Sequence, residues 1–527
     1  YRPERESAVW HIHEKAAQEF ASRSREMALV RLTPEDSQQL LTNLVALSPW
    51  PADTRALILS RTEGNPLYLE ELLRALMDDG VLARDESGWQ LSGDLAALKV
   101  PDTLEGVMMT RLDRLGEACR HTTQVASVVG RLFPFDLLTN VAPEPQETSI
   151  SPCLSRLQAH EIVREAQRAP ELVYTFRHGV MQEVCYGSLL ARNRRLYHRK
   201  IAAYLEASQG EVESNLALIA HHAFAGQDWP RALHYQTLAG QQAQKLFANH
   251  EATDHFTRAL QAAGDLPPAE TLEQRQTIHT ALGQLLTTTG QYDLAREHLT
   301  GAHALALERG DPDGQAQACR WLSRLHELRG EYPSAFEWIE RGLSALAGRE
   351  TAETAQLHIN AGLIHTRQGN YDSALDHCQT ALRIAQQLGE LTALARSNNM
   401  LGVITRNRGD NAAAADYFRR ALDLYQQAGD IHGQAIAHNL IANACFNTGQ
   451  WQAADHHYRR ARDIFNQIGD LYNRAFADNN LGGIALNQGR LDEALAFYQD
   501  ALQSLERIGG SAYVLGAIQM NLGAALI

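Results

Sequence analysis

The sequence lacks several features that would assign it to familiar classes of protein. No stretch approaches the roughly 18 consecutive apolar residues of a membrane-spanning helix. The six cysteines are scattered and form no C-x-x-C pair, which favours a reducing compartment over a disulfide scaffold. The formal net charge of −14 disfavours nucleic acid or an anionic membrane as a partner. We therefore expect a cytoplasmic protein that binds neither.

Patterns for metal binding and catalysis are missing as well. The 22 histidines include no H-E-x-x-H pattern. Adjacent pairs such as His221-His222 point to different faces of a helix, so we expect them to be structural. Glycine never precedes lysine, so the phosphate-binding loop G-x-x-x-x-G-K-[ST] does not occur. We expect no catalytic residue, no metal site and no cofactor for this chain alone.

The length and the two ends suggest part of a larger protein. A chain of 527 residues is too long for one core, so several domains or a repeat array are expected. The chain begins at Tyr1 without a methionine or a secretory signal, and it ends at Ile527 within an apolar helical pattern. We expect both ends to have been cut from a longer protein.

The second half contains an internal repeat. Glycines recur with spacings of 40, 39, 40, 40 and 40 residues, and alanines keep the same register. Such a unit is a helical hairpin, because glycine ends the first helix and small residues permit close crossing of the second. Each hairpin leaves an apolar face open, so the units must stack. The repeated glycines are Gly290, Gly330, Gly369, Gly409, Gly449 and Gly489.

Two segments, "MLGVITRNRGDNAAAADYFRRAL" and "NLGGIALNQGRLDEALAFYQDAL", resemble the tetratricopeptide repeat (TPR). The resemblance implies a right-handed superhelix whose first helices line a concave surface for a protein or peptide ligand. Ligand-facing positions of the family fall on asparagines in three repeats. An asparagine amide can donate to and accept from a peptide backbone, although exposed asparagine is also common near helix ends. The candidates are Asn399, Asn407, Asn439, Asn443, Asn447, Asn479 and Asn487.

The first half has a different organisation. "LTPEDSQQLL" predicts a helix with Thr33 as its N-cap, and "EGNPLYLEELLRALMDDGVL" predicts a helix from Leu67 with one buried face. "GVLARDESGWQL" predicts a hairpin, and a second hairpin pairs "EIVREA" with "LVYTFRH". Three helices followed by such a hairpin describe a winged helix. DNA binding would be usual for that fold, but the expected recognition helix has little basic charge.

These segments, in this order, resemble the lid and winged-helix region of STAND ATPases, a signal-transduction branch related to AAA+ proteins. They resemble in particular the bacterial kind fused to a cyclase or kinase domain and a TPR array. In that family a Gly-x-Pro turn begins a lid helix and its proline contacts adenine, which implies this role for Gly64 and Pro66. The resemblance also implies that His178 reaches the β-phosphate of ADP and that Arg2 faces the γ-phosphate. A lone Gly-Asn-Pro can equally be a simple helix-start turn.

The predicted fold is therefore mostly α. We expect the edge of the NTPase core at 1–32, a helical lid at 33–97, a winged helix at 98–206, linking hairpins at 207–275 and TPR repeats at 276–527. The resemblance implies the regulatory part of an ATP-dependent switch, with ATP or ADP and Mg²⁺ bound only by the complete protein. It also allows self-association on activation. The alternatives are a TPR scaffold without nucleotide switching, or the regulatory region of a nucleotide cyclase or transcriptional regulator.

Overall fold

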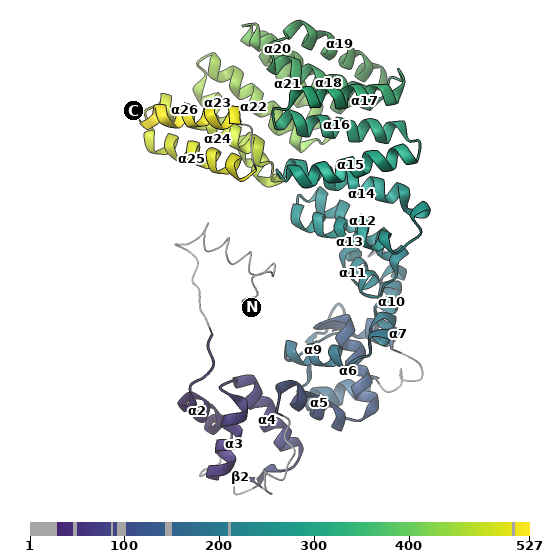
Figure 1. The fold of residues 1–527 in the computed structure, drawn as a ribbon. Helices are drawn as coiled ribbons and strands as arrows, with labels where there is room; N and C mark the ends of the chain where they lie inside the picture. The colour runs from purple at the N-terminus through teal and green to yellow at the C-terminus, as the bar shows by residue number, and fades with distance from the viewer. Residues whose placement is uncertain are drawn as a thin grey trace. The chain divides into compact units, whose positions relative to one another are not determined.

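The computed structural model describes residues 29–45, 50–85, 88–91, 102–142, 150–208, 212–508 and 512–526, and these are mostly helical (Figure 1). The prediction of a mostly α fold is confirmed. The chain divides into two compact units, residues 1–204 and 205–527. Each unit is described by itself below.

The first unit opens with three helices and a hairpin. These elements are α2 (Pro34–Leu44), α3 (Ala52–Thr62), α4 (Pro66–Asp78), β1 (Leu82–Asp85) and β2 (Gly88–Leu91). Thr33 caps α2, as predicted, because its hydroxyl accepts from the backbone N–H of Asp36 at 3.1 Å. The apolar faces of the helices meet in one core around Leu41, Ile58 and Leu72.

Helices and a small antiparallel sheet follow in the same unit. The sheet has the order β3-β5-β4, so the predicted hairpin of β4 and β5 forms and β3 adds a third strand on the other side of β5. Phe133 and Phe176 are fully buried on its inner face. The elements are α5 (Leu104–Arg114), α6 (Glu117–Val129), β3 (Leu132–Pro134), α7 (Phe135–Val141), α8 (Ile150–Ala159), β4 (Val163–Gln167), β5 (Val173–Phe176), α9 (Gly179–Ser188) and α10 (Ala191–Ala207).

The second unit is a continuous series of helices in which each helix packs on the next. It forms the TPR-like superhelix that the repeat predicted. Its helices are α11 (Val212–Ala225), α12 (Trp229–Lys245), α13 (Asn249–Gly264), α14 (Pro268–Thr288), α15 (Tyr292–Glu308), α16 (Pro312–Leu328), α17 (Tyr332–Leu346), α18 (Ala352–Arg367), α19 (Tyr371–Leu388), α20 (Leu391–Asn407), α21 (Asn411–Ala428), α22 (Ile431–Asn447), α23 (Trp451–Ile468), α24 (Leu471–Asn487), α25 (Leu491–Arg507) and α26 (Ala512–Leu526).

The repeated glycines and small residues form the hairpins in the predicted way. Each of the six repeated glycines follows the first helix of a hairpin with φ between +74° and +99°, a backbone region that other residues avoid. Gly402 lets two helices cross closely, because a Cβ there would lie 2.5 Å from the ring of Phe418. Phe418 is fully buried in this crossing.

The first helices of successive hairpins also pack on one another and line the inside of the superhelix. Contacts join α14 to α16, α16 to α18, α18 to α20, α20 to α22 and α22 to α24. The series curves so that its last helices return toward α14 and α15 (Figure 1). A Cβ at Gly290, directly before α15, would lie 2.3 Å from the side chain of Ile508, so this return brings the end of α25 against the turn between α14 and α15.

Candidate functional site

The curved array contains a partly open cavity of about 650 Å³. Side chains from α16, α18, α20, α22 and α24 form most of its wall, and we call this cavity the lumen. The backbones of these helices satisfy their own hydrogen bonds, so only side chains present chemistry to the lumen. A volume of this size is typical of ligand pockets.

Distant parts of the array also contact each other. The side chain of Asn249 donates to the carbonyl oxygen of Ile468 at 2.9 Å, across 219 residues of sequence. Phe247 packs on the apolar cluster that contains Ile464, Phe465 and Ile468. We call Phe247 and Asn249, together with this cluster, the latch.

Arginines on three inner helices line one side of the lumen. Arg320 makes a bidentate ion pair with Glu353, with distances of 2.7 and 3.3 Å. Arg324 and Arg367 both pair with the buried carboxylate of Glu327. Each of these three guanidinium groups therefore has a carboxylate partner, and two of them share one.

Arg396, on α20, differs from these three. Its guanidinium donates to the amide oxygens of Gln356 and of Asn360, the latter at 3.1 Å. Burial, and then the neighbouring Arg320, lower the pKa of Arg396 to about 10. Arg396 is therefore a positively charged side chain whose hydrogen-bond partners are neutral amides.

Two of the acidic side chains that line the lumen are already engaged, while Glu390, directly before α20, lines it as well. Asp430 accepts from the backbone N–H of Gly433 and caps α22. Asp470 caps α24 and also lies 2.9 Å from Nε2 of His432. Although burial alone would raise the pKa of Asp470, the hydrogen bond from His432 and those from Asn473 hold it below its ordinary value. These carboxylates act in helix capping.

Two of the seven candidate asparagines line the lumen. Asn399 is 5 % exposed, and its amide nitrogen donates to the Tyr425 hydroxyl at 3.3 Å. The amide oxygens of Asn399 and Asn439 are buried without a hydrogen-bond partner among the described residues. An unsatisfied buried oxygen is costly, so each is a position where a ligand N–H would be stabilising.

The other five asparagines are placed elsewhere and make contacts within the array. The Asn443 oxygen accepts from the Tyr458 hydroxyl at 2.6 Å, and the Asn479 oxygen accepts from Asn521 at 2.9 Å. Asn407, Asn447 and Asn487 are exposed at the ends of their helices. The regular spacing in the sequence therefore does not bring all seven to one surface.

The Gly-Asn-Pro turn in the first unit has a structural explanation. The Asn65 oxygen accepts from the backbone N–H groups of Leu67 and Tyr68 and caps α4, while Pro66 occupies the first helical position. Gly64 has φ +74°, and a Cβ there would lie 2.4 Å from the carbonyl oxygen of Leu32. The backbone of Leu32 therefore fills the space beside Gly64.

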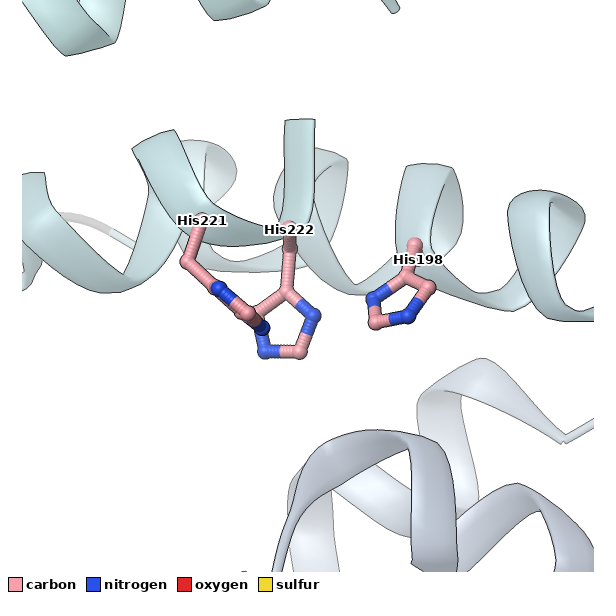
Figure 2. Close-up of side chains that lie close together, drawn as sticks. All are labelled: His198, His221 and His222. Atoms are coloured by element: carbon pink, nitrogen blue, oxygen red, sulfur yellow. The ribbon is translucent and has the colours of Figure 1, made fainter. Parts of the chain in front are cut away.

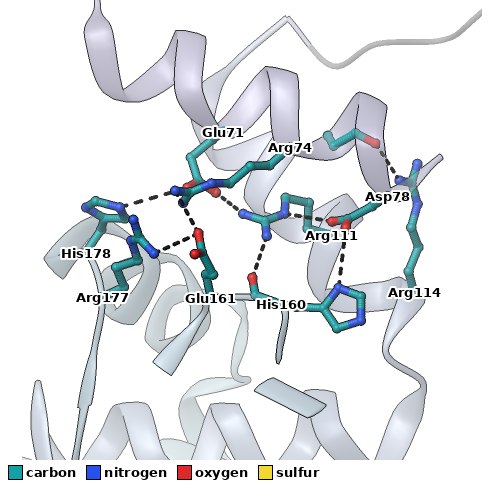
Figure 3. A network of polar contacts seen from close by, with 10 residues as sticks. Glu71, Arg74, Asp78, Arg111, Arg114, His160, Glu161, Arg177 and His178 are labelled. Atoms are coloured by element: carbon teal, nitrogen blue, oxygen red, sulfur yellow. Dashed lines mark hydrogen bonds and ion pairs between the residues drawn. The ribbon is translucent and has the colours of Figure 1, made fainter. Parts of the chain in front are cut away.

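His178 faces the same helix through a polar network (Figure 3). Its Nε2 lies 4.0 Å from a carboxylate oxygen of Glu71 on α4 and has no hydrogen-bond partner among the described residues. Burial lowers the pKa of His178, which Glu71 partly opposes. His178 therefore places a buried ring nitrogen, Nε2, next to α4 without a hydrogen-bond partner among the described residues.

The network is centred on Glu71 and Arg111, whose side chains are 1 % and 2 % exposed and form an ion pair. Arg111 also donates to Asp78 at 3.1 Å and to the carbonyl oxygen of His160 at 2.7 Å. Arg74 continues the network to Glu161 at 2.8 Å (Figure 3). These contacts join α4 to α5 and to the turn between α8 and β4.

The remaining sequence predictions for this chain are placed as follows. Arg2 lies outside the described residues. His221 and His222 on α11 have ring centroids 5.1 Å apart at a steep angle (Figure 2). His221 is exposed and His222 is buried, although the two rings contact each other edge to face. In the ranges that the structure describes, no helix is both long and apolar enough to cross a membrane.

Comparisons with solved structures find similar folds at low sequence identity. A STAND protein with a tetratricopeptide repeat sensor from Pyrococcus horikoshii is 13% identical, with 94% of this chain and 72% of that chain covered and a TM-score of 0.46. The Rap conjugation gene regulator of the plasmid pLS20, in complex with the Phr* peptide, is also 13% identical, with 60% and 91% covered and a TM-score of 0.46.

Sequence comparisons identify the repeats. An uncharacterized protein of Rhizobium meliloti (strain 1021) is 25% identical over 267 residues, which cover 49% of this chain and 25% of that protein. The matched part of the chain thus spans a quarter of the length of this relative. The tetratricopeptide repeat model matches residues 353–427 and 433–507, and these residues are therefore tetratricopeptide repeats.

Proposed function

We propose that the second unit is a ligand sensor that binds a protein segment or peptide in the lumen. The observation that carries this proposal is the pair of buried, unpartnered amide oxygens of Asn399 and Asn439. They lie on successive inner helices, α20 and α22, and both line the same cavity. Tetratricopeptide repeats are binding surfaces, so an extended peptide whose N–H groups reach these oxygens is the ligand that fits best.

Selection from a synthetic library of capped hexapeptides tests this proposal. The peptides that remain bound after gel filtration would be identified by mass spectrometry. We expect the wild-type chain to retain peptides, and the double variant Asn399→Ala with Asn439→Ala to retain at least tenfold less. The matched control is Asn407→Ala with Asn487→Ala, since both asparagines are exposed at helix ends. Equal retention by both double variants would place the ligand outside the lumen.

A second candidate function concerns the first unit, which we propose to be the lid and winged helix of a STAND-type nucleotide switch. Pro66 begins α4, and the buried, unpartnered Nε2 of His178 lies against the same helix. A nitrogen of this kind fits a phosphate oxygen as its partner, whereas the space beside Gly64 is already filled by Leu32. Pro66 and His178 would then hold the adenine and phosphate ends of ADP, while Mg²⁺ and the phosphate loop would belong to a core outside this chain.

In this proposal the ligand in the lumen biases the nucleotide state of the complete protein. ADP would favour a closed state, and ligand binding would favour an open state that permits ATP exchange. Activation would release an output domain, such as a cyclase, a kinase or a transcriptional regulator, or would allow self-association in the cytoplasm. The alternative is a TPR scaffold without nucleotide switching.

Measurements on the complete protein separate the switch from the scaffold. We expect His178→Ala to weaken ADP binding and to make the output active without ligand. The control is His250→Ala, because His250 is exposed on α13. If ADP affinity and output were the same in both variants, the phosphate role of His178 would be wrong and the scaffold would be favoured.

A further inference from the structure

Three pairs of histidines join the two helices of alternate hairpins in the second unit. In each pair the Nδ1 atoms of the two rings lie 2.8 to 3.0 Å apart, and the ring centroids lie 5.1 Å apart. The first histidine lies on the first helix of its hairpin, and the second lies 19 residues later, on the second helix. The pairs are His279–His298 on α14 and α15, His358–His377 on α18 and α19, and His438–His457 on α22 and α23.

The packing of a hairpin does not require these histidines. At the equivalent positions, α20 and α21 carry Asn398 and Tyr417, while α16 and α17 carry Cys319 and Trp338. These helices pack on each other as extensively as those that carry the pairs. Both imidazoles of a pair therefore recur together at positions where other residues serve the fold equally well.

The nitrogens that face each other can serve as metal ligands. Burial lowers the pKa of all six rings, so each ring is neutral at pH 7 and keeps a nitrogen lone pair. The contact between two Nδ1 atoms is a hydrogen bond in which one of them carries the hydrogen. When that hydrogen lies on Nε2 instead, both Nδ1 atoms present lone pairs and the charge is unchanged. The rings are half-buried, so an ion can reach them from solvent.

The distance between the two nitrogens selects the kind of metal ion. Imidazole nitrogens bind Ni²⁺, Cu²⁺ and Zn²⁺, with bonds of about 2.0 to 2.1 Å. Two such bonds at a right angle place the nitrogens about 2.9 Å apart, whereas a tetrahedral angle requires about 3.3 Å. The observed separation of 2.8 to 3.0 Å matches the right angle. Right angles are typical of square-planar and tetragonal Cu²⁺ and Ni²⁺.

The charges around His358–His377 favour a cation most. Burial and the neighbouring histidines lower the pKa of His377 to about 4, and the carboxylate of Asp376 opposes them. Burial, and then the charge of Arg383, lower the pKa of His358. Arg383 is itself paired with Glu350, through contacts of 2.6 and 3.0 Å, so its repulsion of a cation is weakened.

The other two pairs have less favourable surroundings. The charges of Arg275 and Glu297 act on the first pair in opposite directions. Arg419 and Arg460 both add positive charge beside the third pair. We therefore expect the pairs to differ in affinity, with His438–His457 the weakest.

We propose that each pair binds one divalent transition-metal ion through its two Nδ1 atoms, with Cu²⁺ and Ni²⁺ bound more tightly than Zn²⁺. The strongest site is His358–His377. Water fills the remaining coordination positions, and the ion links the two helices of its hairpin. None of the six histidines is among the described residues that line the lumen, so these sites are independent of the proposed peptide site. A spacing of 19 residues across a turn matches no short ligand motif, so the sequence alone predicted no metal site.

Counting the copper bound by the full chain tests this inference. The chain would be dialysed at pH 7 against copper(II) chloride buffered with glycine, and bound copper would be measured by atomic emission. We expect His358→Asn with His377→Tyr to bind one Cu²⁺ fewer per chain than the wild type. These replacements are the residues of the next hairpin at the equivalent positions. The control, His250→Asn, removes an exposed histidine of α13 and should leave the count unchanged.

The array also permits a test by gain of a site. Asn398→His with Tyr417→His places a pair on α20 and α21, and we expect this variant to bind one further Cu²⁺. Asn398 and Tyr417 are half-buried, as the histidines of the pairs are. Electron paramagnetic resonance of the added copper should show coupling to two imidazole nitrogens. Circular dichroism would confirm that each variant folds.

The order of the metals tests the geometry. We expect the Tm of the wild type to rise most with Cu²⁺, less with Ni²⁺ and least with Zn²⁺. Mg²⁺ should leave the Tm unchanged, because it prefers oxygen ligands. A larger rise with Zn²⁺ than with Ni²⁺ would overturn the right-angle arrangement.

The two double variants decide whether the pairs are the sites. Equal copper counts in the wild type and in His358→Asn with His377→Tyr would overturn the site and show that the copper is adventitious. If that variant does not fold, the gain variant decides the question. Failure of the folded gain variant to bind a further ion would show that two histidines at these positions do not form a site.

Discussion

The side chain of Asn249 donates a hydrogen bond of 2.9 Å to the carbonyl oxygen of Ile468, 219 residues further along the chain. The bond joins the start of α13 to the end of α23. Most contacts in the array join neighbouring helices, but this bond, the adjacent packing of Phe247 and the approach of Ile508 to Gly290 join distant ones. We expect the latch to contribute to the curvature of the array.

We expect Phe247→Ala combined with Asn249→Ala to open the array without unfolding its hairpins. Loss of one hydrogen bond and of a half-buried aromatic contact should cost about 2 to 4 kcal/mol at the latch. Small-angle X-ray scattering should show a larger radius of gyration, while the helical circular dichroism stays the same. His250→Ala changes the exposed residue next to Asn249 and should alter neither the radius of gyration nor the circular dichroism. An unchanged radius in the double variant would mean that other contacts close the array.

Three pairs of histidines should make the second unit less stable in acid. Their Nδ1 atoms lie 2.8 to 3.0 Å apart in His279–His298, His358–His377 and His438–His457. Burial, and then the partner histidine, lowers the pKa of His279, His377 and His438 from 6.5 to about 4. Between pH 6.5 and pH 4 the unfolded chain binds more protons than the folded chain. The free energy of unfolding is therefore highest above pH 6.5 and falls as the pH drops toward 4.

Urea unfolding at pH 7 and pH 5 measures this effect. We expect a loss on the order of 1 kcal/mol per pair, since the half-buried rings are partly screened by solvent. The array provides a replacement pair, because the next repeat carries Asn398 and Tyr417 at the equivalent positions. His358→Asn with His377→Tyr should therefore be less sensitive to pH than the wild type. Equal sensitivity would assign the acid response to other groups.

Gly64 should be intolerant of any side chain. Gly64→Ala would force alanine into φ +74° and would place Cβ 2.4 Å from the Leu32 carbonyl oxygen. We expect a loss of about 2 to 4 kcal/mol in the first unit, from backbone strain and displacement of Leu32. Gly80→Ala is the control, because Gly80 has φ +68° but no atom within 4 Å of the added Cβ. Gly80→Ala should lower the free energy of unfolding by about 1 kcal/mol. If thermal unfolding showed equal losses for both variants, the close approach of Leu32 to Gly64 would be unimportant.

The Glu71–Arg111 ion pair should show strong coupling. Glu71→Gln or Arg111→Met alone leaves one buried charge without its main partner, and we expect each to cost about 3 kcal/mol. The double variant removes both charges and should cost clearly less than the sum of the two. A double-mutant cycle in chemical denaturation measures the difference. Additive losses would show that Asp78, Arg74 and the His160 carbonyl satisfy each charge without the other.

Much of the fold follows from short-range signals in the sequence. The glycines at intervals of about 40 residues predict the hairpin turns, and the positive φ of each confirms them. Thr33 and Asn65 are side-chain caps at helix starts that the sequence marks with Thr-Pro and Asn-Pro. The structure also explains Gly64 without any ligand, because the neighbouring backbone of Leu32 already requires a glycine.

The candidate site was only partly predictable. Asparagines in repeat register predicted one surface, but only Asn399 and Asn439 line the lumen, while Asn443 and Asn479 contact other side chains of the array. The histidine pairs left a signal that a search at twice the repeat length would have found. Their first members, His279, His358 and His438, are spaced by 79 and 80 residues.

The sequence by itself determined where helices begin and end and which of their faces are buried, because those outcomes depend on neighbours within a few residues. Only the tertiary structure decided that the array closes at Asn249 and Ile468 and that Arg396 faces a lumen with neutral partners. These features depend on the small rotation between successive hairpins, summed over the whole array. A sequence pattern specifies each hairpin, but the accumulated rotation decides which distant side chains meet.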